Sequence, residues 1–557
     1  MSKQWWKKSV VYQIYPKSFR DTTGNGTGDI QGIIEKLDYL RKLGVDVIWL
    51  TPVYASPQND NGYDISDYFS IHPEYGTIQD FEALLEATHQ RGMKLIMDIV
   101  VNHTSTEHDW FKQSQSSPDN LYRDFYIWKN GEADGPPTNW QSKFGGSAWQ
   151  WDQATEQYYL HLFDVTQADL NWENEQVRRE VYQMMNFWLD KGVDGFRLDV
   201  INLISKDQLF PNDDAGDGRK FYTDGPRVHE FLHEMNQQVF KGRQTITVGE
   251  MSSTTLEDCI DYSNPAREEL DMTFNFHHLK VDYPNGEKWT KADFDFLELK
   301  QILSKWQLGM QQGGGWNALF WCNHDQPRVV SRFGDDGEFH EESAKMLATT
   351  IHLMQGTPYI YQGEELGMIN PKLATIDQYR DVESLNMYDM KKAEGMSEKK
   401  IIEILQEKSR DNSRSPMQWN SGAHAGFTPG TPWINVADNY PDINAEQAIA
   451  DSDSIFYHYQ QLIALRKEYQ VITDGTYQLL LPEHLAIFAY VRENDEEWML
   501  VVNNFYDERV LFTLPDDIDR FDGSGEVILA NYPMEDRAVH HRELLPYESF
   551  VYYQKKK

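Results

Sequence analysis

The chain has 557 residues, of which 40% are apolar and 25% are charged. These values indicate a globular protein too long for one compact core, and they exclude collagenous, low-complexity and disordered classes. Asp and Glu total 88 against 52 Lys and Arg, which gives a formal net charge of −36. Because so acidic a surface repels nucleic acid and anionic lipid, we expect a monomer with neither kind of partner.

The two cysteines, Cys259 and Cys322, stand far apart and outside any CxxC or Cys/His cluster. Neither a disulfide scaffold nor a zinc site is predicted. The first residues contain no apolar run of signal-peptide length, and no stretch approaches the ~18–20 apolar residues of a membrane helix. We therefore expect a cytoplasmic location.

Short apolar runs rich in β-branched and aromatic residues recur along the chain and predict strands at residues 10–16, 45–51, 94–102, 193–200, 245–250, 270–276, 317–325 and 357–363. A helix is predicted between the first two, because apolar residues recur there at helical spacing and Gly44 follows them; they are Ile30, Ile33, Ile34, Leu37, Leu40 and Leu43. Similar helical stretches occupy 79–91, 177–191 and 341–355. Alternating strands and helices predict an α/β fold, a closed parallel (β/α)₈ TIM barrel. An open doubly wound sheet is the weaker alternative, because the dinucleotide fingerprint is absent.

Two further units are predicted. Residues 104–171 are rich in Trp, Asp, Gly and Pro and lack helical periodicity, which predicts a small loop-rich domain inserted after strand three. Residues 1–103 and 172–470 would form the catalytic barrel, with an elaboration near 367–419 after strand eight. Alternating strand patterns at 471–557 predict a C-terminal antiparallel, sandwich-like β-domain.

Reactive side chains in such barrels lie at the C-terminal ends of strands. Here the strand ends and the loop after strand two carry polar groups that converge at one rim: Asp60, Tyr63, Asp64, His103, Arg197, Asp199, Glu250, His324 and Asp325. Each of these residues alone could be an ordinary helix cap or surface charge. Burying so many polar groups at one place costs free energy, however, and therefore indicates a functional site. Several acids without a metal-binding His/Cys set predict cleavage of a glycosidic bond by two carboxyl groups.

The motifs GYDISDY, VVNHT, GFRLDV, TVGEM and NHDQPR occur in this order. They strongly resemble the α-amylase superfamily, glycoside hydrolase family thirteen, and within it the oligo-1,6-glucosidase group. The resemblance spans nearly the whole chain, from WWKKSVVYQIYPKSF to RDNSRSPMQW and beyond. Segments such as HLFDVTQADLNWENE and FYTDGPRVHEFLHEMN are similar to the bacterial members that act on trehalose 6-phosphate.

The resemblance implies a retaining α-glucosidase. Asp199 would be the nucleophile, Glu250 the general acid and base, and Asp325 the group that stabilises the transition state. Asp64, His103, Arg197 and His324 would bind the reacting glucose, Tyr63 would stack on it, and Asp60 with Arg410 would hold its 4-hydroxyl. We expect the carboxyl groups of Asp199 and Glu250 to be ~5–5.5 Å apart, as in retaining enzymes.

The implied substrate is a phosphorylated disaccharide, trehalose 6-phosphate, cleaved to glucose and glucose 6-phosphate. On so acidic a protein the phosphate needs local cations. The loop after strand six supplies basic residues, and we expect them to bind the phosphate, although an ordinary solvated loop is the alternative: His277, His278, Lys280 and Lys288.

Two other functions stay open at this point. One is an oligo-1,6-glucosidase or dextran glucosidase acting on non-reducing α-1,6-linked glucose. The other, a non-catalytic partner of a membrane transporter, is disfavoured because the acidic trio is intact.

The loop DTTGNGTGD, residues 21–29, places Asp21, Asn25 and Asp29 between glycines. This spacing fits a structural calcium ion, although close relatives carry more acidic ligands there. A glycine-rich turn held by its own hydrogen bonds is equally favoured. We expect no required cofactor.

Overall fold

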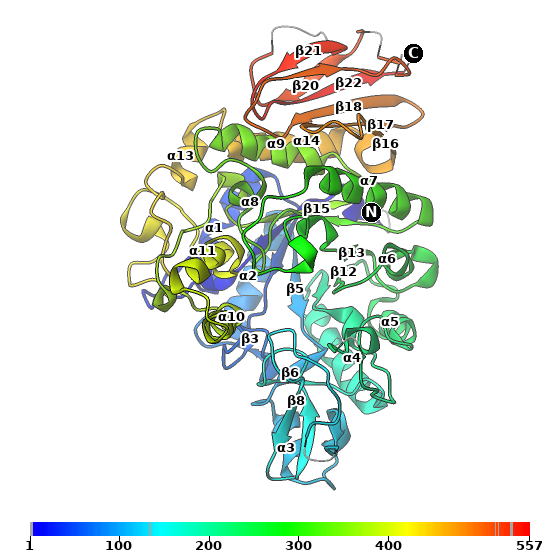
Figure 1. The fold of residues 1–557 in the computed structure, drawn as a ribbon, viewed down its shortest axis with the longest axis vertical. Helices are drawn as coiled ribbons and strands as arrows, with labels where there is room; N and C mark the ends of the chain where they lie inside the picture. Colours follow the sequence, from blue (N-terminus) through cyan, green and yellow to red (C-terminus); the bar gives the residue numbers. More distant parts are fainter. Residues whose placement is uncertain are drawn as a thin grey trace.

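A closed barrel of eight parallel strands forms the centre of the computed structural model, which describes residues 4–132, 135–214, 216–518, 520–521, 523–534 and 539–556 (Figure 1). The strands are hydrogen-bonded in the order β13-β12-β11-β5-β2-β1-β15-β14. Their bounds are β1 (Val11–Ile14), β2 (Val47–Leu50), β5 (Lys94–Ile99), β11 (Gly195–Leu198), β12 (Ile246–Glu250), β13 (Met272–Phe274), β14 (Ala318–Leu319) and β15 (Thr357–Tyr361). A parallel bridge between Thr273 and Asn317 closes the ring. The predicted (β/α)₈ barrel is therefore confirmed.

Helices surround this barrel, and four of them match the predicted periodic stretches: α1 (Ile30–Leu43), α2 (Ile78–Gln90), α4 (Glu175–Asp190) and α9 (His340–His352). In α1 the Asp29 side chain accepts the Gly32 N–H, and Gly44 ends the helix with φ of 98°. The buried face of α1 includes Ile33, Leu37 and Leu40. Burying one such side chain contributes about 1.5–3 kcal/mol, so the apolar stripe rather than the capping residues fixes the helix on the barrel.

The seventh strand is shorter than predicted. Only Ala318 and Leu319 form β14, whereas the prediction ran to residue 325. Beyond it the chain turns, and the Asn323 side chain accepts the backbone N–H of Asp325 at 2.8 Å. His324 and Asp325 therefore stand on a turn above the barrel rather than on a strand.

The segment between β5 and β11 projects from one end of the barrel (Figure 1). Its ends pair as β6 (His103–Ser105) with β10 (Gln167–Asp169), and a three-stranded sheet and a helix follow inside: β7 (Trp128–Lys129), β8 (Trp149–Asp152), β9 (Gln157–Leu160) and α3 (Asp109–Ser116). Trp140 of this insertion packs against Phe210 and Tyr222 from the loop after β11, with ring centroids 5.5 and 5.7 Å apart. The insertion is thus anchored to a loop that follows a barrel strand.

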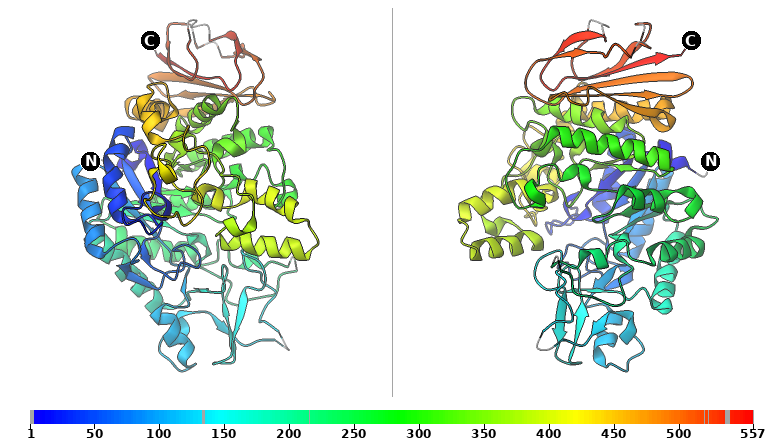
Figure 2. Two further views of the ribbon diagram at one scale, coloured as in Figure 1. Left: turned by 90° about the vertical axis from the view of Figure 1, so that its left-hand side faces the viewer. Right: turned by 45° about the vertical axis from the view of Figure 1, so that its right-hand side comes forward.

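Residues from Thr476 onward form a mainly antiparallel β-structure at the opposite end of the molecule (Figure 2). A five-stranded sheet joins β16 (Thr476–Leu480), β17 (Ile487–Glu493), β18 (Glu497–Asn504), β22 (Ser549–Lys555) and β20 (Glu526–Ala530), beside the pair β19 (Val510–Thr513) and β21 (His541–Leu544). Along β17, Phe488 and Tyr490 belong to the barrel core, whereas Ile487 and Ala489 belong to a second core. Because strand side chains alternate between faces, one sheet covers both cores.

The elaboration after β15 contains α10 (Val382–Ala393), α11 (Glu398–Lys408) and α12 (Asp411–Arg414), and it delivers Arg410 to the barrel rim. Of the remaining helices, α5 (Val228–Met235), α6 (Leu256–Ser263) and α7 (Phe296–Gly313) flank the later strands. Within the described residues, no helix combines the length and apolar character that crossing a membrane requires.

Candidate active site

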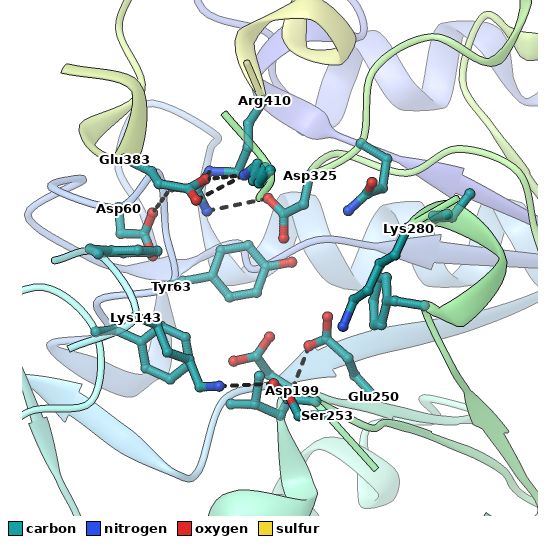
Figure 3. Close-up of a pocket in the computed structure, with 18 of the residues that line it drawn as sticks. Asp60, Tyr63, Lys143, Asp199, Glu250, Ser253, Lys280, Asp325, Glu383 and Arg410 are labelled. Carbon is teal, nitrogen blue, oxygen red and sulfur yellow. Dashed lines mark hydrogen bonds and ion pairs between the residues drawn. The ribbon is translucent and has the colours of Figure 1, made fainter. Parts of the chain in front are cut away.

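A cavity of about 320 Å³ opens at the C-terminal ends of the barrel strands, where the insertion and α10 form its walls (Figure 3). Seven of the predicted catalytic and sugar-binding residues line it: Asp60, Tyr63, His103, Asp199, Glu250, Asp325 and Arg410. The three predicted catalytic acids come from the ends of β11 and β12 and from the turn after β14. Parallel strands bring their C-terminal ends to one rim, so these acids meet although they are far apart in the sequence.

One buried guanidinium connects the two acids predicted to act on the bond. Arg197 is 1% exposed, and its Nη1 lies 2.6 Å from Asp199 Oδ1 while its Nη2 lies 2.7 Å from Glu250 Oε2. Its Nη1 is also 2.8 Å from Asp98 Oδ1. Arg197 does not line the cavity, and its guanidinium holds the two acids in position. The expectation that it also binds the sugar stays a prediction.

Burial and one shared cation have opposite effects on the pKa values of these two acids. Burial raises the pKa of Asp199 to about 7 and that of Glu250 to about 8, while Arg197 opposes both shifts. The Val200 backbone N–H donates to Glu250 Oε2 at 3.1 Å. Both shifts have the same direction, so near neutral pH this pair of carboxyl groups can hold a proton that one of them gives to a leaving oxygen.

Asp325 is held ionised by arginines. Arg414 Nη2 lies 2.8 Å and Arg410 Nη1 3.4 Å from Asp325 Oδ1. Burial opposes ionisation, but the positive charges around it hold the pKa of Asp325 well below its usual range. Arg410 also pairs with Asp60 at 3.1 Å. A permanent negative charge therefore faces the same cavity as Asp199 and Glu250.

Tyr63 and His103 form part of the cavity wall, and His324 packs behind Tyr63. The Tyr63 ring stacks on His324, with centroids 5.1 Å and planes 6° apart. His103 lines the cavity, and burial lowers its pKa to about 4. His324 is fully buried and lies behind the wall: Gln13 Nε2 is 2.8 Å from its Nδ1, and its Nε2 is 3.3 Å from Asp325 Oδ2. His324 therefore supports Tyr63 and Asp325 instead of lining the cavity.

Asp64 does not line the cavity, and the expectation that it binds the glucose stays a prediction. Its fully buried carboxylate accepts the backbone N–H groups of Asn59 at 2.8 Å and Asp60 at 3.1 Å and the Ser56 hydroxyl at 3.0 Å. The Asp64 side chain thus shapes the turn that presents Asp60.

The four basic residues predicted to bind phosphate occupy different positions. Lys280 lines the cavity. His278 is buried with Nε2 bonded to the Phe320 carbonyl oxygen at 2.8 Å, and His277 packs on Trp306, so both lie outside the cavity. Lys288 lines the cavity, but its ammonium pairs with both Glu383 oxygens at 2.7 and 2.8 Å. Lys280 and Lys288 are thus the two of the four that reach the cavity, and Glu383 compensates the charge of Lys288. Phosphate binding by any of the four stays a prediction.

Two further basic side chains, which the sequence analysis did not predict, line the cavity together with Lys280. Lys143 of the insertion donates to Ser252 Oγ at 3.0 Å, and Arg219 follows β11 with its Nε 3.6 Å from Asp217. Burial, then the charges of Arg219 and Lys280, lowers the pKa of Lys143 to about 7. We call Lys143, Arg219 and Lys280 the cation cluster. They come from three separate segments, so no local sequence signal joined them.

The amino groups of Lys143 and Lys280 lie on either side of Asp199 and Glu250 (Figure 3). In the part of the chain that the structure describes, neither amino group has a carboxylate within 4.0 Å. On a chain with net charge −36, two lysines without ion pairs beside an acid pair form a site suited to an anion.

The loop predicted to bind calcium, residues 21–29, is stabilised by hydrogen bonds to its own backbone. The Asp21 carboxylate accepts N–H groups from Thr23, Gly24 and Gly26 at 2.8 Å and the Thr428 hydroxyl at 2.5 Å. The Asn25 Oδ1 atom accepts the Thr27 N–H, and Asp29 caps α1. N–H groups directed at these oxygens occupy the positions a cation needs, so the loop as built does not fit calcium. No group of three or more His, Cys, Asp or Glu among the described residues fits a metal ion.

Two carboxyl groups on one guanidinium, a third held ionised by arginines and a cavity at the C-terminal rim of a (β/α)₈ barrel define a glycosidase of the two-carboxyl class. The model of the alpha amylase catalytic domain matches residues 13–475, and that of the alpha-amylase SusG C-terminal domain matches residues 487–551. The chain belongs to the alpha-amylase family.

Relatives within the family are similar over nearly their whole length. The trehalose-6-phosphate hydrolase of Bacillus subtilis (strain 168) is 66% identical over 98% of both chains. The oligo-1,6-glucosidase of Bacillus cereus is 52% identical over 99% of this chain and 100% of its own. The crystal structure of Bacillus licheniformis trehalose-6-phosphate hydrolase matches with a TM-score of 0.96 and 66% identity, covering 99% of this chain and 100% of that one.

Proposed function

We propose that this chain is a retaining α-glucosidase that hydrolyses trehalose 6-phosphate to glucose and glucose 6-phosphate. The relatives named trehalose-6-phosphate hydrolase support this substrate, since they are more similar than those named oligo-1,6-glucosidase. The chemistry needs two carboxyl groups and no cofactor.

In the first step, the carboxylate of Asp199 attacks the anomeric carbon of the unphosphorylated glucose. Glu250 gives its proton to the departing oxygen, and glucose 6-phosphate leaves. In the second step Glu250 takes a proton from water, which displaces Asp199 and releases glucose. Both carboxyl groups contact one guanidinium, which favours the short separation of ~5–5.5 Å typical of retention.

The remaining residues hold the glucose ring. We place it against Tyr63, with Asp60 and Arg410 binding its 4-hydroxyl and Asp325 facing the ring as positive charge develops. The ion pair of Asp60 with Arg410 closes the pocket at that end, so only a terminal glucose fits.

The cation cluster determines the preference for a phosphorylated substrate. A phosphate dianion beside Glu250 would otherwise meet a protein of net charge −36. Charge-assisted hydrogen bonds from Lys143, Arg219 and Lys280 offset that repulsion and the desolvation of the phosphate. This supports a phosphate on the leaving sugar, because the cluster lies beside the acid that protonates the leaving oxygen.

A second candidate is an oligo-1,6-glucosidase that cleaves isomaltose-type ends. The compensated pair of Lys288 with Glu383 at the cavity wall favours it, because a neutral pair offers hydrogen bonds to hydroxyl groups without requiring an anion.

The test compares kcat/KM for trehalose 6-phosphate and for isomaltose in the wild type and in the Lys143→Gln/Lys280→Gln double variant. We expect the wild type to favour trehalose 6-phosphate. Hydrogen bonds to charged groups contribute about 1.5–3 kcal/mol each, so the double variant should lose about 10²-fold or more of that preference.

Lys291→Gln is the matched control, since Lys291 is exposed and follows the same loop without lining the cavity. A wild type that prefers isomaltose, or equal losses on both substrates in the double variant, would overturn the proposal.

A further inference from the structure

The cavity contains a nucleophilic amine that the hydrolysis of a glycosidic bond does not use. We propose that Lys143 is a covalent modification site, where its amino group forms an imine with a small phosphorylated aldehyde while Arg219 and Lys280 hold the phosphate. Hydrolysis needs only carboxyl groups at the anomeric carbon, so this chemistry is separate from the proposed reaction. The adduct fills the cavity and excludes substrate, and it therefore acts as a reversible covalent inhibitor.

The amino group of Lys143 is held at the cavity wall by neutral partners. Its Nζ donates to Ser252 Oγ at 3.0 Å and lies 5.4 Å from the centre of the Tyr222 ring. Ser252 is held in turn by the Asn202 side chain, which accepts the Ser252 N–H at 2.9 Å and donates to its carbonyl oxygen at 2.9 Å. A neutral amine still has N–H groups to donate to the hydroxyl. Lys143 therefore keeps its position when it loses a proton.

Neighbouring positive charges favour the neutral, nucleophilic form of this amine. Burial, followed by the charges of Arg219 and Lys280, lowers the pKa of Lys143 to about 7. The carboxylates of Glu250 and Asp217 act in the opposite direction. Lysines that are desolvated, or that lie next to another cation, are the ones that form imines with carbonyl compounds. Lys143 meets both conditions.

The other two members of the cation cluster select the kind of aldehyde. Arg219 keeps several N–H donors for a phosphate although its Nε lies 3.6 Å from Asp217, and Lys280 lies across the acid pair from Lys143 (Figure 3). A phosphate held by these two side chains brings the rest of its molecule close to the Lys143 amine. The cavity, of about 320 Å³, has the size of a small-molecule site. The ligand class is therefore a small aldehyde that carries a phosphate.

The reaction forms one bond to nitrogen and releases water. The lone pair of the Lys143 amine attacks the aldehyde carbon, and a proton passes from nitrogen to the former carbonyl oxygen. Loss of the resulting hydroxyl group as water leaves a C=N bond between Lys143 and the ligand. Ser252 Oγ is hydrogen-bonded to the amine and is placed to relay the proton. No oxidation or reduction takes place, and addition of water reverses the reaction.

The test uses pyridoxal 5′-phosphate as the phosphorylated aldehyde and pyridoxal as the matched compound without phosphate. The full chain is incubated with each compound, treated with borohydride to trap imines, and analysed by peptide mass spectrometry. We expect Lys143 to carry the predominant adduct. Hydrogen bonds from charged groups to the phosphate should make its labelling about tenfold or more faster with pyridoxal 5′-phosphate than with pyridoxal. Inorganic phosphate should slow the labelling.

Variants separate the nucleophile from the phosphate site. Lys143→Arg should lose the adduct, and its hydrolysis of p-nitrophenyl α-glucoside should resist pyridoxal 5′-phosphate when compared with its own rate without the aldehyde. Lys280→Gln should slow the labelling of Lys143 by about tenfold. Lys291→Gln is the control and should keep the wild-type labelling rate, since Lys291 is exposed and pairs with Glu407.

Predominant labelling of Lys280 or of exposed lysines, or equal labelling rates with the two aldehydes, would refute the inference. The wild-type peptide map alone decides this, so the inference remains testable if a variant does not fold. These outcomes are distinct from failure of the proposed function. An enzyme that prefers isomaltose but is labelled at Lys143 loses the proposed function and keeps the inference, and one that prefers trehalose 6-phosphate without this labelling does the reverse.

Discussion

At the scale of single residues, charge compensation decides what each polar side chain in the site does. Arg197, Asp64 and His324 carry the same chemical groups as the residues that line the cavity, but their hydrogen-bonding capacity is directed at other side chains and at the backbone. Lys280 and Lys143 differ because they lack such carboxylate partners among the described residues. The lysines at the cavity wall therefore differ in charge: Lys288 is paired with Glu383, whereas Lys143 and Lys280 have an ammonium group without a carboxylate partner in the described part of the chain.

Asp199 and Glu250 predict the pH profile of the reaction. On a neutral aryl α-glucoside, kcat/KM should fall below about pH 7 as Asp199 gains a proton, and above about pH 8 as Glu250 loses one. Glu250→Gln should lower kcat/KM for a poor leaving group by about 10²–10⁴-fold and remove the alkaline limb. Steady-state rates across pH measure both effects. An alkaline limb that persists in the variant would assign that titration to another group.

At the scale of elements, the insertion contributes Lys143 to the cation cluster and contacts the loop after β11 that carries Arg219. Gly218 has φ of 77°, and a Cβ atom there would lie 2.3 Å from the Trp140 ring. Only glycine allows this approach, and the next residue along the chain is Arg219. The packing of Trp140 against the loop therefore places Arg219 on the same side of the cavity as Lys143.

Lys206 is a second link between the insertion and the barrel. Its buried ammonium lies 2.8 Å from Asp169 Oδ2 on β10 and donates to Asn102 Oδ1 at 2.8 Å. Lys206→Met should destabilise the protein by about 3–5 kcal/mol, because it leaves the buried Asp169 charge unpaired. The midpoint of thermal unfolding measures this. Lys112→Met, on the exposed face of the insertion, is the control and should change stability by about 0.5 kcal/mol or less. Equal effects of the two variants would contradict the assigned role of Lys206.

At the scale of the whole molecule, three units have different roles in forming and supporting the site. The barrel supplies the acids, the insertion and α10 close the cavity, and the C-terminal sheet lies at the far end and covers barrel helices (Figure 2). The fold places a local cluster of positive charge inside a molecule whose formal net charge is −36. The cavity thus offers local positive charge on a protein whose net negative charge repels polyanions.

Lys300 joins the C-terminal sheet to the barrel. From α7 its ammonium donates to the carbonyl oxygens of Leu481 at 2.9 Å, His484 at 2.8 Å and Ile487 at 3.1 Å. Lys300→Met removes these donors and leaves three carbonyl oxygens without them, so the sheet should separate more easily. We expect faster limited proteolysis between the barrel and the sheet and a lower unfolding midpoint, with glucosidase activity preserved below that midpoint. Unchanged proteolysis would show that apolar packing alone holds the sheet.

The sequence by itself determined the barrel and the acid trio. Apolar runs that alternate with helical stretches specify parallel strands. Parallel strands bring Asp199, Glu250 and the residues after strand seven to one rim, independently of the conformation of the loops. The family resemblance then led to the substrate class that the relatives support. For these features the local pattern is sufficient, because strand direction alone fixes where the side chains meet.

Only the tertiary structure decided which polar groups face the cavity. Three basic residues are close in the sequence, His277, His278 and Lys280, but of these only Lys280 lines the cavity. The His277 ring packs on Trp306, and the His278 ring is hydrogen-bonded to the Phe320 carbonyl oxygen. Lys143 and Arg219 reach the same place from segments more than 70 residues apart in the numbering. The physical reason is that charge compensation and side-chain direction depend on contacts between distant segments, and those contacts exist only in the folded chain.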